Sequence, residues 1–310
     1  MIVRLLGTIL FILSATWIVY GNDSYLSVDP SSTNSTDQEV NSLLWKVSGN
    51  GLNSPSYVFG TIHIIDSEDY FLPAGTEPSF DKCEEVVFEI DMDDMTDFSQ
   101  LFPILQNLMM PEGQTLKTLL SEEDYQMVQS HFQELGLPIF MLERIKPMFL
   151  TVFASGDISP GDLQNGSMRS YEMELNNMAK EKGKETGGLE TIEFQMQVFD
   201  RIPYKDQADM LVEALSAGDD EDGQFQELVD MYKAQNIHEL YRMMKGDENI
   251  TKYEDVLLVQ RNENWIPVMK EKMHKYSTFF AVGAGHLAGP KGVLKLLEDE
   301  GYEVEAVRAL

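Results

Sequence analysis

Two apolar runs near opposite ends of this 310-residue chain finish with the same short pattern, a glycine followed by two residues and a histidine. Gly60–His63 reads Gly-Thr-Ile-His, and Gly283–His286 reads Gly-Ala-Gly-His. The residues before each pattern are aromatic, aliphatic and β-branched, as is typical of strands buried on both faces of a sheet. Ligands of α/β proteins bind beyond the carboxyl ends of such strands. Both histidines are therefore expected at strand ends, as two halves of one site.

The pattern of apolar residues predicts an α/β fold. Strands are expected where short β-branched runs lie between turn residues, at 43–47, 56–62, 86–91, 277–283 and 302–307. Pro290 begins a helix that continues to Glu300 between the last two strands, which makes a C-terminal βαβ unit. The expected fold is a central mixed β-sheet, this βαβ unit and a large helical insertion at about 98–275.

Within the insertion, one short strand is expected at 184–189. Helices are predicted at 121–136, 168–182, 191–200, 206–215, 225–235, 237–245 and 255–275. The acidic run Gly218–Gly223 is interpreted as a solvated loop, because it lacks the ligand spacing and the closing glutamate of a calcium loop.

The N-terminus predicts export. Residues 1–21 combine a basic start with a short apolar run and small residues, which indicates a secretory signal peptide. Residues 22–41 are rich in Ser, Thr, Asn and Asp and are expected to form a flexible linker before one α/β domain at 42–310. The protein is thus expected to be secreted, periplasmic or extracellular. The alternative is a retained membrane anchor, which the short apolar run disfavours. If the segment is not retained, no membrane contact is expected.

The chain is strongly acidic, with a formal net charge of −29 at pH 7. Such a surface is a poor partner for nucleic acid, and it attracts cations, divalent metals among them. Cys83 is the single cysteine of the chain, so an internal disulfide framework is excluded. Its acidic neighbours disfavour a thiolate, and a packed structural role is expected.

Acidic and basic side chains near the predicted strand ends are the next candidates. Glu89 lies inside the apolar strand at 86–91, where a carboxylate is costly unless it is paired or bound to a metal. Glu190 follows the short strand at 184–189, where capping the next helix is the alternative role. Arg261 and Asn262 lie on an apolar stretch of helix; the arginine suits a carboxylate clamp or an oxyanion contact, and an ordinary pair within the helix is the alternative.

Glycine suits the turn that follows each strand. Gly60, Gly283 and Gly285 permit a close backbone approach and support the loops that carry the two histidines. Core or capping histidines are the alternative interpretation of the paired pattern. A dinucleotide-binding turn at Gly283 is disfavoured, because no second βαβ unit and no ribose-binding acid follow it. Histidines outside the pattern have no second ligand at helical spacing and are assigned to the surface or to caps: His131, His238 and His274.

Taken together and in order, these segments resemble the TraB/PrgY/GumN family, which includes the TIKI metalloproteases. The similarity extends from about Leu44 to Val307. It rests on the two histidine patterns, on the Glu89 strand, on Gly188-Leu189-Glu190-Thr191 followed by Gln195, and on Arg261-Asn262 with Trp265. The resemblance implies an α/β fold of the erythromycin esterase/ChaN type. It also implies a divalent-metal peptidase site, with Mn²⁺ or Co²⁺ favoured and Zn²⁺ as a further candidate.

The resemblance assigns roles residue by residue. His63 and His286 become metal ligands, and Glu89 becomes a ligand or general base. Glu190 supports the site electrostatically, and Arg261 with Asn262 positions the substrate or the developing oxyanion. One segment departs from the family pattern: many members carry an aspartate near the helix before Gly-Leu-Glu-Thr, where this chain reads Arg169-Ser170-Tyr171-Glu172. Any role of that aspartate is therefore in doubt for this chain.

Three functions fit these observations. The first is an exported metal-dependent hydrolase, a peptidase with a peptide or protein substrate. The second is a protein that binds and sequesters a peptide or small ligand without cleaving it. The third is capture of haem or a metal ion by the paired histidines.

Overall fold

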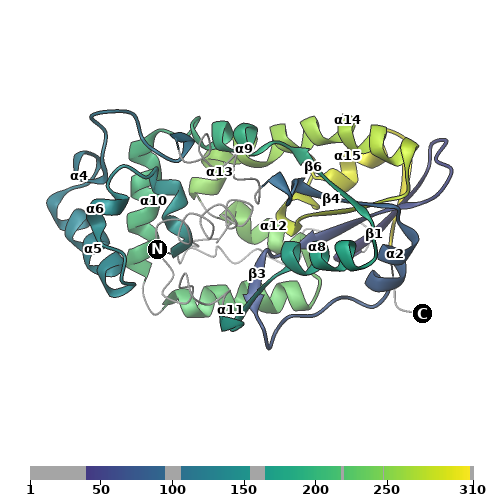
Figure 1. Cartoon of the computed structure of the whole chain (residues 1–310), viewed down its shortest axis with the longest axis horizontal. Coiled ribbons are helices and arrows are strands. Elements are labelled where there is room, and N and C mark those ends of the chain that lie inside the picture. The colour runs from purple at the N-terminus through teal and green to yellow at the C-terminus, as the bar shows by residue number, and fades with distance from the viewer. Residues whose placement is uncertain (1–39, 95–105, 154–164, 218–219, 247, 308–310) are drawn as a thin grey trace, which may run out of the picture.

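A six-stranded mixed sheet forms the centre of the protein (Figure 1). The computed structural model describes residues 40–94, 106–153, 165–217, 220–246 and 248–307. The strands lie in the order β6, β4, β7, β2, β1 and β8. Their bounds are β1 (Leu44–Gly49), β2 (Ser56–Thr61), β4 (Glu85–Ile90), β6 (Glu185–Glu190), β7 (Thr278–Gly283) and β8 (Tyr302–Ala306). The prediction of an α/β protein with a central mixed sheet is confirmed.

Four neighbouring strands run in the same direction, because β4 is parallel to both β6 and β7, and β7 is parallel to β2. β1 is antiparallel to both β2 and β8, so β8 has the direction of β7. The predicted βαβ unit is therefore present, with β2 and β1 lying between its two parallel strands. The register pairs Thr61 with Gly283 and Ile90 with Glu190. The carboxyl ends of the four parallel strands consequently meet at one edge.

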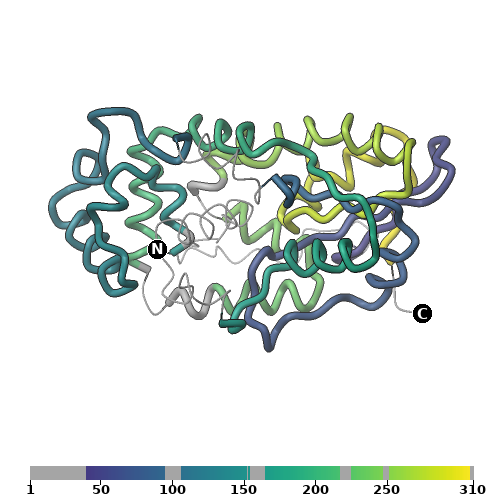
Figure 2. The backbone as a smooth tube through the Cα atoms, viewed as in Figure 1, coloured from purple at the N-terminus to yellow at the C-terminus, as the bar shows by residue number. Residues whose placement is uncertain are grey.

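Helices cover both faces of the sheet (Figure 1). α2 (Thr76–Lys82) and α8 (Tyr171–Glu181) lie on one side, and α14 (Gln260–Lys275) and α15 (Val293–Asp299) lie on the other. Figure 2 shows a second group of helices at the opposite end of the molecule, beyond the carboxyl edge of the sheet. The remaining helices and the small two-stranded sheet are α4 (Leu116–Leu119), α5 (Glu122–Glu134), α6 (Ile139–Leu142), α9 (Ile192–Phe199), α10 (Tyr204–Ala217), α11 (Asp220–Lys233), α12 (Ile237–Gly246), α13 (Glu248–Glu254), β3 (Ile64–Asp66) and β5 (Met168–Ser170).

Two large apolar cores and one small cluster stabilise the described part of the fold. One surrounds the sheet and includes Phe88 and Phe279, and Cys83 is buried within it as predicted. The other lies in the helical group and includes Phe149, and it extends to Ile90 at the end of β4. Burial of each phenylalanine stabilises the fold by roughly 1.5–3 kcal/mol. The carboxyl edge of the sheet therefore lies between two packed cores.

Several predicted boundaries are wrong. The helix predicted at 168–182 is strand β5 followed by α8, because Met168–Ser170 pairs with β3. α15 begins at Val293 rather than Pro290, because Gly289–Gly292 first makes a turn in which the Gly292 N–H bonds to the carbonyl of Gly289. The acidic run is not a loop throughout, because α11 begins at Asp220. β6 belongs to the central sheet, so it divides the predicted helical insertion into two parts.

No helix in the described part of the chain is long and apolar enough to cross a bilayer. The predicted signal peptide at 1–21 lies outside the described residues, as does nearly all of the predicted linker at 22–41. Export therefore stays a prediction.

Candidate active site

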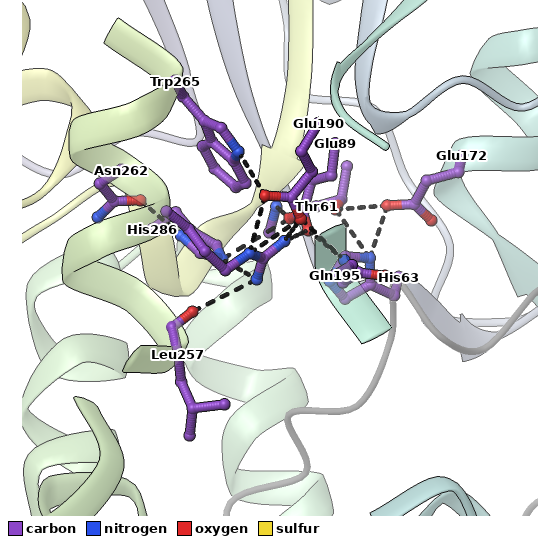
Figure 3. A network of polar contacts seen from close by, with 12 residues as sticks. Thr61, His63, Glu89, Glu172, Glu190, Gln195, Leu257, Asn262, Trp265 and His286 are labelled. Carbon is purple, nitrogen blue, oxygen red and sulfur yellow. Dashed lines mark hydrogen bonds and ion pairs between the residues drawn. The ribbon is translucent and has the colours of Figure 1, made fainter. Parts of the chain in front are cut away.

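The structure brings the predicted site residues together at the carboxyl edge of the sheet (Figure 3). His63 follows β2 and His286 follows β7, while Glu89 and Glu190 lie at the ends of β4 and β6. Arg261, in the first turn of α14, donates hydrogen bonds to both glutamates. All of these side chains are buried or nearly so. Residues far apart in sequence meet here because parallel strands place their carboxyl ends at one edge.

His63 has a left-handed backbone conformation, and the carboxylate of Glu172, for which the sequence interpretation gave no role, holds its ring. Its φ of 62° is rare for a residue with a side chain. Its Nδ1 lies 2.7 Å from Glu172 Oε1, which also accepts a 2.7 Å bond from the Thr61 hydroxyl. The other oxygen of Glu172 accepts a bond of 3.1 Å from Ser170. Because Nδ1–H donates to Glu172, Nε2 keeps its lone pair in the neutral ring.

The pKa of His63 reflects two opposing effects. Burial opposes a charge on the ring, but the neighbouring carboxylates of Glu172 and Glu89 outweigh it and raise the pKa above the ordinary 6.5. Nε2 lies beside Gly283, where a Cβ atom would be 2.9 Å from Nε2 and 3.3 Å from Glu89 Oε1. Glycine is therefore required at position 283 for the imidazole and the carboxylate to approach each other. Gly60 and Gly285 also fill tight positions, against Leu287 and Met244.

The side-chain amide of Asn262 holds the His286 ring through Nδ1. Asn262 Nδ2 donates to the carbonyl of Lys291 at 2.9 Å, so the Oδ1 atom of Asn262 faces His286 Nδ1 at 2.6 Å. Nδ1 therefore carries the proton, and Nε2 presents a lone pair 3.2 Å from Arg261 Nη1. Burial, together with the positive charges of Arg261 and His63, lowers the pKa of His286 to about 3. The ring is neutral at physiological pH.

Glu89 lies between the two histidines. Its Oε1 accepts the Gly283 N–H at 2.8 Å and is 3.8 Å from His286 Nε2, and its Oε2 accepts Arg261 Nη2 at 2.5 Å. Burial alone would raise the pKa of this carboxyl. Arg261, the two histidines and the Gly283 N–H outweigh burial and lower the pKa to about 2. Glu89 is therefore an anion in the folded protein.

Arg261 ties the two glutamates together. Its Nε and Nη2 atoms donate to Glu190 at 3.0 and 2.6 Å, a planar two-point contact that lysine cannot make. The indole N–H of Trp265 donates to the other oxygen of Glu190 at 2.9 Å, and the guanidinium stacks on the same indole. The alternative interpretation of Glu190 as a helix cap is therefore wrong, because its carboxylate lies in this network. The same contacts exclude an ordinary intrahelical pair for Arg261.

A π-helical segment sets the direction of α14. Asp255–Val259 makes the wider turn, with the Gln260 N–H bonded to the carbonyl of Asp255. Such segments occur often at functional sites. Directly after it, the consecutive residues Arg261 and Asn262 are both buried and contact opposite nitrogens of His286. No local pattern indicates the π turn, because its residues fit an ordinary helix equally well.

The lowered pKa of His286 predicts an acid-sensitive fold. The unfolded chain takes up a proton at this residue below about pH 6.5, whereas the folded protein takes it up only near pH 3, so stability is lost as pH falls between these values. Between pH 6.5 and about pH 5, the metal-free wild type is expected to lose roughly 2 kcal/mol more unfolding free energy than His286→Gln. Urea unfolding measures the difference. Equal losses of unfolding free energy in the wild type and His286→Gln would contradict the prediction. The control is His274→Gln, on the exposed face of α14, which should lose as much as the wild type.

The site offers donor atoms of the kinds that bind divalent cations. Histidines that bind metals usually donate their second ring N–H to a fixed oxygen, as His63 and His286 do here through Glu172 and Asn262. Two such imidazoles and the Glu89 carboxylate suit a divalent cation in kind. In the described residues no group of three or more His, Cys, Asp or Glu side chains is already arranged to hold one. The Arg261 guanidinium contacts both His286 and Glu89 instead.

Comparison with known proteins identifies the family. A sequence model of the TraB/PrgY/gumN family matches residues 43–306. The chain belongs to this family. It is similar to metalloprotease TIKI1 of Danio rerio, with 24% identity over 88% of this chain, and to metalloprotease TIKI1 of Homo sapiens, with 25% identity over 86%. The chain spans 64% and 62% of the length of these two relatives. No solved structure gives a significant match to this member of the family.

Proposed function

We propose that this chain is a divalent-metal-dependent hydrolase that cleaves peptide bonds outside the cytoplasm. One observation carries the proposal: two histidines from opposite ends of the chain are each held through Nδ1 and present Nε2 beside a buried, ionised glutamate. Membership of the family and the names of the similar metalloproteases support it. The acidic chain and its apolar N-terminal run agree with an exported protein that attracts cations.

The residues that would hold the cation are His63 and His286 through Nε2 and Glu89 through Oε1. When bound, a divalent cation such as Mn²⁺ or Co²⁺, with Zn²⁺ as a further candidate, polarises a carbonyl and lowers the pKa of water. Glu89 suits the role of ligand, because a carboxyl with a pKa of about 2 is a weak base. Its burial beside Arg261 keeps this anion fixed in place.

Glu190 and Arg261 would position the site. The oxygens of Glu190 accept bonds from Arg261 and Trp265, so this carboxylate is less available than Glu89 to take a proton. Arg261 carries a permanent positive charge beside both glutamates, and its pKa is raised further by them. We infer that it orients Glu89, and that its Nη1 atom would turn from His286 and the Leu257 carbonyl to an oxygen of the substrate. Asn262 fixes the His286 ring.

Peptide cleavage tests the proposal directly. The chain without residues 1–21 is stripped with chelator, supplied with Mn²⁺ or Co²⁺, and incubated with a diverse peptide library that is read by mass spectrometry. Metal-dependent products that disappear on renewed chelation are the expected result. Saturable peptide binding with no products would overturn the peptidase proposal.

Peptide binding without cleavage is the second candidate function. It is favoured by the contacts of Arg261 with His286 and Glu89, which satisfy two of the proposed ligands within the protein itself. The same library assay separates the two candidates. Haem addition tests the third function, because a new visible absorbance band would indicate capture of haem by the histidines.

Glu172 is expected to control metal affinity through His63. Glu172→Gln removes the charge that faces Nδ1, and loss of such a partner costs about 10- to 100-fold in affinity. The measurement is Mn²⁺ binding by electron paramagnetic resonance. Glu174→Gln is the matched control, because Glu174 lies on the same helix and pairs with the half-exposed Arg169. Equal Mn²⁺ affinity in the two variants would remove Glu172 from the site.

A further inference from the structure

Two buried glutamines in this protein differ in how their amides are satisfied. Gln207 donates to the carbonyls of Phe199 and Ile202, both at 2.9 Å, and its Oε1 accepts the Met148 N–H at 3.2 Å. Gln195, on α9, is 2% exposed, yet its Oε1 has no hydrogen-bond donor in the described part of the chain. A buried acceptor without a donor destabilises a fold. Gln207 has the contacts of a structural residue, and Gln195 does not.

Charge fixes the direction of the Gln195 amide. Its Nε2 lies 3.3 Å from Glu190 Oε1 and 3.5 Å from Glu89 Oε2, the two carboxylates that Arg261 joins. A flipped amide would place its oxygen against both anions, which is unfavourable. The nitrogen therefore faces the glutamates, and Oε1 is the end left unpaired. Other buried atoms without partners lie elsewhere in the described chain, and Gln195 is the one that contacts Glu89 and Glu190.

The donors nearest to Gln195 are already used. Arg261 donates to both glutamates, to the carbonyl of Leu257 and to His286. The indole of Trp265 donates to Glu190, and the Gly283 N–H donates to Glu89. The described residues therefore leave no donor for Oε1, and a bound molecule could supply one.

We propose that Gln195 binds the substrate, with Oε1 accepting a hydrogen bond from a main-chain N–H of a bound peptide. A cation would be drawn to Glu89 and Glu190, whereas a neutral amide oxygen suits a neutral N–H. A peptide N–H loses its water on entering a buried site and needs such an acceptor. The inference rests on the peptide-binding part of the proposed function and needs no cleavage. It assigns the protein a contact to the peptide backbone that is independent of side-chain sequence.

Ester substitution tests the contact. A pooled random library of peptides about six residues long is bound to metal-free wild-type protein, and the tightest peptide is synthesised again with each main-chain N–H replaced in turn by an ester oxygen. The wild type is expected to lose about tenfold in affinity at one position. Gln195→Met has a similar shape and no acceptor, so it should bind the amide and ester forms equally there. Gln207→Met, the matched control, should keep the wild-type discrimination.

Each outcome decides the inference. The inference is supported if Gln195→Met, but not Gln207→Met, loses the preference for the amide over the ester peptide. Thermal unfolding is used to show that both variants fold. The same amide preference in Gln195→Met as in wild type would overturn it, and so would a wild type that is indifferent to every ester, because water would then satisfy Oε1. Peptide binding here, with no products in the library assay that contains Mn²⁺ or Co²⁺, leaves the inference standing and removes the peptidase proposal. A wild type that binds no peptide, whether Mn²⁺ is absent or present, overturns both.

Discussion

Arg261→Met is expected to lower the free energy of unfolding by about 3–5 kcal/mol. The variant leaves Glu89 and Glu190 buried without their cation, and removing one partner of a buried ion pair costs about this much. Urea unfolding near neutral pH measures the loss. The indole of Trp265 would also lose the guanidinium that stacks on it.

Two variants make the Arg261 result specific. Lys291→Met removes an exposed cation that pairs with Glu263, a residue of α14 like Arg261. This change should lower the free energy of unfolding by at most about 1 kcal/mol. Adding Glu190→Gln to Arg261→Met removes one of the two uncompensated charges and should restore part of the lost stability. An Arg261→Met protein as stable as the Lys291→Met control would show that the guanidinium does not hold the two glutamates.

His63→Ala is expected to lower metal-dependent peptide cleavage on the order of 10³-fold or more, because the variant removes a proposed ligand from the reacting centre. The measurement is kcat/KM for a peptide found in the library assay, with Mn²⁺ held in excess. His286→Ala should behave alike, since the two imidazoles serve one site. His274→Ala changes an exposed histidine and should keep wild-type activity. A His63→Ala protein that cleaves at the wild-type rate would exclude the histidine from the chemistry.

The sequence predicted those parts of the fold that local pattern determines. Strands such as β2 and β7 are short and apolar and have a glycine at or next to their last residue, and the sequence predicts both their positions and the histidines after them correctly. Glu89 was found because an acid inside an apolar strand is costly. The meeting of both histidines with Glu89 followed from parallel strands sharing one carboxyl edge, a rule that needs no side-chain detail.

Other features depend on contacts that no local pattern contains. Glu172 reads as an ordinary acid in the first turn of a helix, and its bond to His63 joins residues 109 positions apart. β5 has three residues and exists because it pairs with β3, so its sequence was taken for helix. The π turn before Arg261 has no local signal in the sequence. In each case tertiary packing decides the structure, and local propensity does not.

The central claim is that two histidines, one from each end of the chain, hold a single divalent cation beside Glu89. Anomalous diffraction from crystals grown with Mn²⁺ tests it most directly. The account predicts one anomalous peak within about 2.5 Å of the Nε2 atoms of both His63 and His286, with Glu89 as a further ligand. A protein that shows no peak there, with the Arg261 guanidinium still bonded to His286 and Glu89, would contradict the account.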